Sequence, residues 1–284
     1  MFLRSFALVM LAALCSGVAQ AQFSGSIKLH KKQHLVGEPV MVRVTLTNYT
    51  GEEQILHGNR MPWISFIVKT MNGKPVHARA PINPKPIRIG AGESLAKDFN
   101  LTRQFQLNQE GNYKVSAVIR PNDKSLDGTS TGREQFQLSS GRLYWKQKVG
   151  KAGASKSTRE YRVIEFRGDK NTQLYIQIED EDTGRILRTS SLGNVLMMRK
   201  PSMVVDREQH AHILFLSNPN TWFHYRISPD GEIKTSQMHR RTSVGDPKLT
   251  VFDNGEVRVT NSILFDPEFE AEQRAKIRSV TERP

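Results

Sequence analysis

Residues 36 to 48 read Val-Gly-Glu-Pro-Val-Met-Val-Arg-Val-Thr-Leu-Thr-Asn, and this stretch decides the fold class. From Val40 to Thr47 apolar and polar side chains alternate, as they do in a β-strand with one face in a core and the other in water. Turn-forming residues bound the segment on both sides. We therefore predict a β-strand over residues 40–47.

Other strand-like segments follow before residue 143, separated by turn residues, and no amphipathic helical pattern interrupts them. Regular spacing of short strands with turn signals is typical of an antiparallel β-sandwich. The predicted strands cover residues 63–69, 99–107, 113–119 and 134–138.

The stretch at 36–48, together with residues 89–94, 99–101 and 110–115, resembles secreted bacterial immunoglobulin-like modules of the macroglobulin and BsuPI proteinase-inhibitor types. The resemblance covers residues 26–143 and implies an immunoglobulin-like β-sandwich. It also implies that Tyr113 packs at a corner with its hydroxyl bonded to nearby backbone. A resemblance of this kind implies a fold and no activity.

The N-terminus is typical of a secretory signal peptide over residues 1–21. Arg4 supplies the positive charge, an apolar run follows, and Ala19-Gln20-Ala21 forms the cleavage site. We predict export to the periplasm or the extracellular space. The single cysteine, Cys15, would leave with this segment, which excludes disulfides and cysteine-ligated metals from the mature chain. No later stretch of 18 apolar residues predicts a membrane span.

The second half of the chain is again rich in predicted strands with Asp/Asn/Gly turns. A weak repeat relates residues 201–206 to residues 247–253, and its spacing suggests blade-like antiparallel meanders, although the length excludes a complete propeller. The tail has the charge order of a helix that begins near Asp266. We predict a β-sandwich at 22–143, a basic linker at 144–160, an antiparallel β domain at 161–265 and a C-terminal helix and tail at 266–284.

The chain has 41 Lys and Arg against 28 Asp and Glu, a net charge of +13. The excess is uneven: residues 22–141 hold 16 basic and 9 acidic side chains, residues 142–162 hold 7 and 1, and residues 163–284 hold 17 and 18. The charge therefore points to the first domain and the linker.

Aromatic residues lie among the cations of residues 142–162, a combination that suits a polyanion because cations neutralise charge while rings stack. Alternatively, the cations only solvate an exposed connector and the aromatic residues end a strand in a core. A further aromatic-rich segment, 218–225, would expose Trp222 if Phe223 and Tyr225 lie in the core. The predicted partner-binding residues are Tyr144, Trp145, Lys146, Lys148, Lys151, Arg159 and Trp222.

No catalytic motif, metal site or cofactor site is predicted. His210 and His212 would share one face of a strand, with Asp206 or Glu208 nearby and His224 and His239 further on, but no spacing identifies a third metal ligand. The acidic segment 179–184 lacks the closing acid of a calcium loop, so we predict a hairpin turn there.

We expect an exported, non-enzymatic envelope protein that binds an anionic or protein partner, such as envelope polysaccharide, through the β-sandwich and the basic linker. No nucleic-acid-binding motif is present, so sequence-specific nucleic-acid binding is not expected. One alternative is a proteinase inhibitor that presents the proline-rich loop 80–86. Another is a glycan-active enzyme in the second half that uses Asp206 and Asp253.

Overall fold

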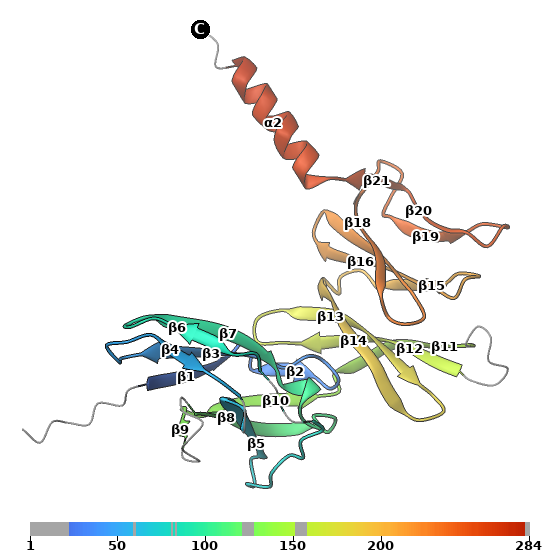
Figure 1. The fold of residues 1–284 in the computed structure, drawn as a ribbon. Helices are drawn as coiled ribbons and strands as arrows, with labels where there is room; N and C mark the ends of the chain where they lie inside the picture. The colour runs from blue at the N-terminus through green and yellow to red at the C-terminus, as the bar shows by residue number, and fades with distance from the viewer. Residues whose placement is uncertain are drawn as a thin grey trace, which may run out of the picture. The chain divides into compact units, whose positions relative to one another are not determined.

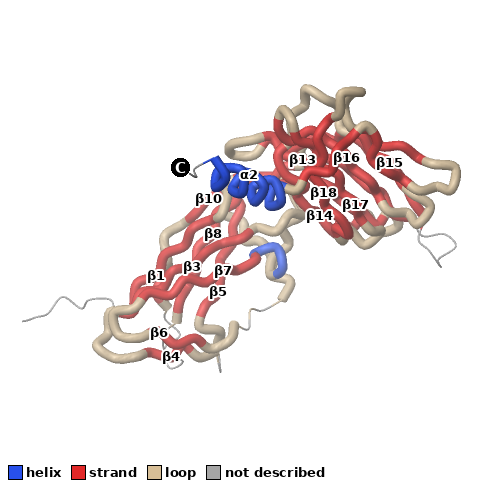
Figure 2. Tube along the Cα trace, turned by 90° about the horizontal axis from the view of Figure 1, so that it is seen from above, coloured by secondary structure: helices blue, strands red, loops and turns tan. Residues whose placement is uncertain are grey.

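The computed structural model describes residues 23–58, 61–80, 82, 84–120, 128–150 and 158–281. The predicted signal peptide lies outside these residues. The described chain is all-β apart from one 3-10 turn and one α-helix near the C-terminus (Figures 1 and 2). Its helices include none that is both long and apolar enough to cross a membrane.

The chain divides into two compact units. The first comprises residues 1–32, 39–107 and 111–137, and the second comprises 33–38, 108–110 and 138–284. The boundary after residue 137 lies a few residues before the predicted one.

Antiparallel sheets build the first unit (Figure 1). One sheet has the order β1–β3–β7, formed by Phe23–Leu29, Met41–Asn48 and Ser94–Asn100. A second sheet has the order β10–β8–β5, formed by Glu134–Ser139, Gly111–Ile119 and Ile64–Thr70, with β9 (Thr129–Ser130) beside β8. The short strand β2 (Gln33–Leu35) belongs to the second unit. A small hairpin pairs β4 (Gln54–Leu56) with β6 (Ile87–Ile89).

The alternating pattern that predicted a strand over residues 40–47 is confirmed by β3. Val42, Val44 and Leu46 are buried, while the residues between them are more exposed. The two sheets contribute facing aromatic rings, with Phe66 of β5 and Phe99 of β7 at a centroid distance of 5.2 Å. These contacts form the apolar core of the unit.

The strand predicted over residues 99–107 is wrong beyond Asn100, where η1 (Leu101–Arg103) begins. The Asn100 side chain accepts a hydrogen bond from the Thr102 N–H at 3.0 Å, and the Thr102 hydroxyl accepts one from the Val40 N–H at 3.0 Å. An asparagine that caps its own following turn competes with strand pairing. The chain therefore leaves the sheet at this residue.

The second unit begins with the antiparallel sheet β11–β12–β13–β14, formed by Arg142–Gly150, Thr158–Arg167, Thr172–Asp180 and Arg185–Asn194. This corrects the linker predicted over residues 144–160. Most of that segment pairs as β11 with β12, because Val149 and Tyr161 are buried in the core of the unit. Residues 151–157, at the tip, lie outside the described residues. The predicted hairpin turn at 179–184 is confirmed, and the Asp180 carboxylate accepts the Thr183 N–H at 3.1 Å.

A second sheet in this unit has the order β15–β16–β17–β18–β21, formed by Ser202–Val205, Ala211–Asn218, Thr221–Ile227, Ile233–Arg241 and Ser262–Phe265. The hairpin β19 (Lys248–Val251) and β20 (Val257–Thr260) lies between β18 and β21 in the sequence. One face of β16, with Ile213 and Phe215, packs in the same cluster as Tyr161 and Ile176 of the first sheet. The other face packs near the β19–β20 hairpin.

The weak sequence repeat corresponds to the hairpins β15–β16 and β19–β20. In the first turn the Asp206 N–H donates to His210 O at 3.0 Å and the Gln209 N–H to Asp206 O at 3.0 Å. The second turn has the same two bonds: the Phe252 N–H donates to Glu256 O at 2.9 Å, and the Gly255 N–H donates to Phe252 O at 2.7 Å. The similar sequences therefore form turns of one geometry.

The predicted C-terminal helix is confirmed as α2 (Pro267–Thr281). The Asp266 carboxylate accepts the N–H groups of Glu268 and Phe269 at 3.0 and 3.2 Å, so Asp266 caps the first turn. Proline at the first position and acids in the first turn agree with the helix polarity.

Candidate functional site

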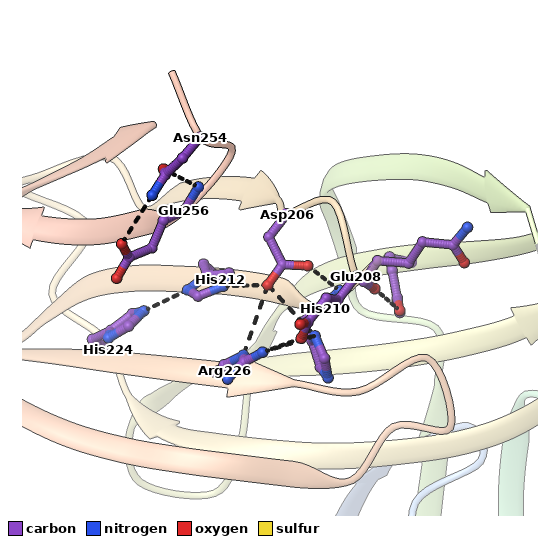
Figure 3. A network of polar contacts seen from close by, with 10 residues as sticks. Asp206, Glu208, His210, His212, His224, Arg226, Asn254 and Glu256 are labelled. Carbon is purple, nitrogen blue, oxygen red and sulfur yellow. Dashed lines mark hydrogen bonds and ion pairs between the residues drawn. The ribbon is translucent and has the colours of Figure 1, made fainter. Parts of the chain in front are cut away.

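A polar cleft of about 490 Å³ opens in the second unit. Its walls come from the turn after β15, from strands β16, β17 and β18, and from the turn between β19 and β20. Figure 3 shows polar contacts that join Asp206, Glu208, His210, His212, His224 and Arg226, with Asn254 and Glu256 in contact with each other beside them. The cleft is our candidate functional site.

The turn after β15 brings three potential metal ligands together. The Asp206 carboxylate accepts the His210 N–H at 2.8 Å, which closes the turn. Gln209 has a positive φ of 63°, and its carbonyl accepts the Tyr161 hydroxyl at 2.7 Å. One ligand atom each from Asp206, Glu208 and His210 then lies within 4.8 Å of the others.

Arg226 supplies the positive charge of this group. Its Nη2 lies 2.6 Å from Glu208 Oε2 and 3.2 Å from His210 Nδ1, and its Nε lies 3.7 Å from Asp206 Oδ2 (Figure 3). A guanidinium in this position offsets one of the two carboxylate charges. The group therefore keeps a net negative charge.

A chain of polar contacts runs from Asp206 along the sheet. Asp206 Oδ2 lies 3.1 Å from His212 Nε2, and His212 Nδ1 lies 3.1 Å from His224 Nε2 (Figure 3). His224 Nδ1 lies 3.3 Å from the Gln237 side-chain oxygen. If Asp206 is ionised, the His212 Nε2–H donates to Asp206, and the His224 Nε2–H donates to His212 Nδ1. His224 Nδ1 is then an acceptor, which the Gln237 side chain satisfies when its amide is turned so that the NH₂ group faces the ring.

Burial keeps these histidines uncharged. It lowers the pKa of His224 to about 4, and repulsion from His212 and His239 acts in the same direction although Gln237 opposes it. Burial also lowers the pKa of His212, against the effect of Asp206, and the pKa of His239. For Asp206, burial acts to raise the pKa, but hydrogen bonds from His212 and from the His210 backbone outweigh it and lower the pKa. At neutral pH the cleft therefore holds an ionised carboxylate beside neutral imidazoles.

The charges of the cleft nearly balance. Three carboxylates, those of Asp206, Glu208 and Glu256, face two guanidinium groups, those of Arg207 and Arg226. Uncharged donors and acceptors from Thr235, Gln237 and Asn254 complete the polar lining. Such a surface can both donate and accept hydrogen bonds without a strong preference for one sign of charge.

Sequence reasoning considered the histidines and Asp206 as metal ligands without predicting a site there, and it did not consider Arg207, Arg226, Gln237 or Glu256 as site residues. The repeat contains a signal for Arg207 and Glu256, because these residues lie in its two turns. The turns contact each other, since Arg207 Nη2 donates to the Asp253 carbonyl at 2.9 Å. Arg226 and Gln237 reach the cleft through strand register, opposite His212 and His224 respectively. That register cannot be read from local sequence.

The predicted partner-binding cations bond to other groups of the second unit. Lys146 Nζ lies 3.6 Å from Glu160, Lys148 bonds to Glu181, and Arg159 bonds to Asp230 at 2.7 Å and to the Pro229 carbonyl. Tyr144 and Trp145 pack against the apolar core, which was the alternative interpretation from sequence. Lys151 lies outside the described residues. In the described part of the basic segment these cations are therefore largely neutralised by acids from neighbouring strands and turns.

Trp222 is buried, with 6% of its surface exposed, and this corrects its predicted exposure. Both faces of β17 are covered: Trp222 packs with Leu214 and Leu216 under Leu249 and Val259 of the β19–β20 hairpin. The prediction assumed that one face of the strand was open to solvent. The covering hairpin makes Trp222 a core residue.

Asp253 and the described residues of the proline-rich loop at 80–86, which the sequence suggested as alternative sites, do not line the cleft. Asp253 is exposed in the β19–β20 turn, and its side chain has no contact with Asp206 among the hydrogen bonds of the described residues. The proline-rich loop at 80–86 includes residues 81 and 83, which lie outside the described residues. Its far end is held by the buried Trp63, whose Nε1 donates to Lys85 O at 3.1 Å.

Comparisons with known proteins do not identify a family. No family model matches the chain, and no curated protein matches it. Among solved structures, the β-glucosidase from Listeria innocua in complex with glucose matches with 18% identity, a TM-score of 0.28 and coverage of 43% of this chain and 16% of that chain. The complex of the same enzyme with isofagomine matches with 18% identity, a TM-score of 0.28 and coverage of 43% of this chain and 17% of that chain. The chain thus spans less than a fifth of those proteins, at a similarity too low to establish a shared fold.

Proposed function

We propose that the protein is an exported, non-enzymatic binding protein of the bacterial envelope and that the polar cleft of its second unit is the ligand site. The proposal keeps the binding role expected from sequence but moves it away from residues 144–160. The ion pairs of Lys146, Lys148 and Arg159 leave that segment poorly suited to hold a polyanion. The predicted signal peptide at 1–21 supports export.

For the first unit we propose an immunoglobulin-like sandwich of the macroglobulin or BsuPI type. The sheets β1–β3–β7 and β10–β8–β5 support this, since Phe66 and Phe99 from the two sheets contact each other. Tyr113 is 4% exposed and stacks on Phe136 at 5.4 Å, as a core tyrosine of such a module would. In this proposal the sandwich is a supporting module and the second unit carries the specificity.

The ligand we propose is a small polyhydroxylated molecule, such as a sugar unit of envelope polysaccharide. The observation that carries this is the near balance of carboxylates and guanidinium groups in a cleft of about 490 Å³. Hydroxyl groups both donate and accept hydrogen bonds, so they can use such a lining without burying an uncompensated charge. The volume is within the range of small-molecule sites, roughly 300–1,000 Å³.

Calorimetry of the mature chain with a panel of neutral mono- and disaccharides tests the proposal. We expect one class to bind, and Gln237→Ala and Glu256→Gln to weaken it at least about tenfold, since the first removes a hydrogen-bonding side chain of the lining and the second replaces a charged acceptor with an amide. Lys148→Gln, outside the cleft, is the control and should bind as the parent does. Absence of binding across the panel, or equal affinity in the cleft variants, would overturn the proposal.

The two alternatives from sequence are outcomes of parallel assays. Release of reducing sugar that is lost in Asp206→Asn and Asp253→Asn would establish a glycan-active enzyme instead. Inhibition of a protease by the mature chain, abolished by changes within residues 80–86, would establish the inhibitor instead.

A further inference from the structure

A second pocket, of about 320 Å³, lies on the outer face of the first unit's sheet, over β5 and β8. Lys69 of β5 and Lys114 of β8 are directly opposite each other in the antiparallel pair, and Arg133 follows β9 at the rim. The pocket contains no carboxylate. It therefore gathers three cations at one place in the unit with the larger charge excess.

The placement of Lys69 opposite Lys114 does not contribute to the stability of the sheet. Like charges directly opposite on neighbouring strands repel, whereas opposite charges at such positions stabilise a sheet. Elsewhere in the same unit cations do have acidic partners: Arg43 bonds to Asp98 at 2.8 Å. Within the described ranges, no ion pair or side-chain hydrogen bond involves Lys69, Lys114 or Arg133. The three cations remain available to a ligand.

The neutral part of the pocket suits an oxyanion. Hydroxyl groups of Thr70, Ser116 and Ser130 line it. Those of Thr70 and Ser130 donate weakly to Lys74 O and Thr131 O, each at 3.4 Å, and that of Ser116 can donate to a ligand beside the cations. Ile67 and Met71, with 42% and 44% of their surfaces exposed, add an apolar edge. A charged group could enter the centre while the carbon skeleton that carries it contacts this edge.

We propose that this pocket binds a phosphate or sulfate monoester group, held by Lys69, Lys114 and Arg133. The inference goes beyond the proposed function, because it concerns a different unit and a different ligand chemistry. It also relocates the anionic partner expected from the charge count, from residues 144–160 to the sheet of the first unit.

Calorimetry on the mature chain with glucose 6-phosphate, glucose 6-sulfate, inorganic phosphate and glucose tests this site. We expect the two esters to bind better than glucose, with an affinity that falls as salt rises. Lys69→Gln and Lys114→Gln should each weaken ester binding about tenfold, the loss expected for one charge-assisted hydrogen bond. The comparison of the esters with inorganic phosphate separates recognition of the whole ester from capture of the free anion.

Two controls distinguish a site from diffuse attraction and from misfolding. Lys97→Gln removes one positive charge from β7 in the same unit and should leave ester affinity unchanged. Lys69→Glu replaces the repulsive pair with an attractive one, so we expect it to raise the melting temperature while abolishing ester binding. Gln237→Ala, in the other cleft, should not affect ester binding.

Equal losses in Lys97→Gln and Lys69→Gln would overturn the proposal in favour of non-specific attraction. Unchanged ester binding in Lys69→Glu would also overturn it. Failure of these tests would leave sugar binding in the second unit unaffected, so the two proposals fail separately.

Discussion

The two units use their cations differently. In the second unit the basic side chains of β11 and β12 lie beside acids, such as Glu160 and Glu181, and Arg226 of the cleft lies beside two carboxylates. In the first unit Lys69 and Lys114 face each other without an acidic partner among the described residues. A count of charges along the sequence ranks residues 142–162 as the richer binding surface, whereas the distribution of acids in space favours the first unit.

The largest effect we expect comes from Asp206→Ala. The side chain is 9% exposed and contacts His212, the His210 backbone and Arg226, so its loss leaves the buried His212 ring without this partner. We expect a loss of about 4 kcal/mol in the free energy of unfolding, the range for breaking a buried charged network. Urea denaturation measures it. Asp98→Ala, which breaks an exposed pair in the first unit, is the matched control, and an equal loss in both variants would erase the contrast between the units.

The next effect is acid destabilisation of the second unit. The folded-state pKa of His224 is about 4, below its unfolded value near 6.5, so the unfolded chain binds more protons between these pH values. The stability from the neutral imidazole is complete above pH 6.5 and is lost as the pH falls toward 4, by about 3 kcal/mol.

Hydrogen exchange at pH 7 and pH 4.5 localises this loss. After correction for the slower intrinsic exchange at the lower pH, the protection factors of peptides from β16 and β17 should be smaller at pH 4.5 than at pH 7, and should fall more than those of peptides from β3. His224→Gln should reduce the difference. An equal fall in the protection factors of β3 would show that the destabilisation does not originate in the histidine cluster.

A smaller effect is expected on a heparin column. Lys69→Gln with Lys114→Gln should elute at distinctly lower salt than the parent, because both cations are free to contact the polyanion. Lys146→Gln with Lys148→Gln removes the same charge from the paired segment and should shift elution less. A larger shift for the second pair would restore the basic segment as the binding surface.

The smallest effect is on stability in Lys148→Gln. Lys148 and its partner Glu181 are both exposed to solvent, with 57% and 34% of their side chains accessible, and exposed ion pairs contribute little. We expect a melting temperature within error of the parent. A clear decrease would show that this pair supports the β11–β12 hairpin.

Much of the local structure could be predicted. Alternation in residues 40–47 identified β3, the polarity of residues 266–278 identified α2, and the Asp/Asn/Gly clusters identified hairpin turns. Each depends on side chains a few residues apart, which is the range over which strand and helix periodicity act. The linker predicted over residues 144–160 was wrong because its composition is polar, although Val149 within it is buried and it pairs as β11 with β12, whose Tyr161 is also buried.

The candidate site was only partly predictable. His210 and His212 were identified by their spacing, but Arg226 and Gln237 enter through cross-strand register. Trp222 was placed on an exposed face because its cover, the β19–β20 hairpin, begins 26 residues later in the chain. Burial of a strand face depends on what packs over it, which local sequence does not encode.

The sequence by itself determined an all-β chain with a capped terminal helix, because alternation and turn chemistry act between near neighbours. Only the tertiary structure decided which charges are neutralised. Arg159 meets Asp230 from 71 residues away, whereas Lys69 meets another lysine 45 residues away. Coulomb interactions depend on distance in space, so the same residue type stabilises the fold in one unit and remains available to a ligand in the other.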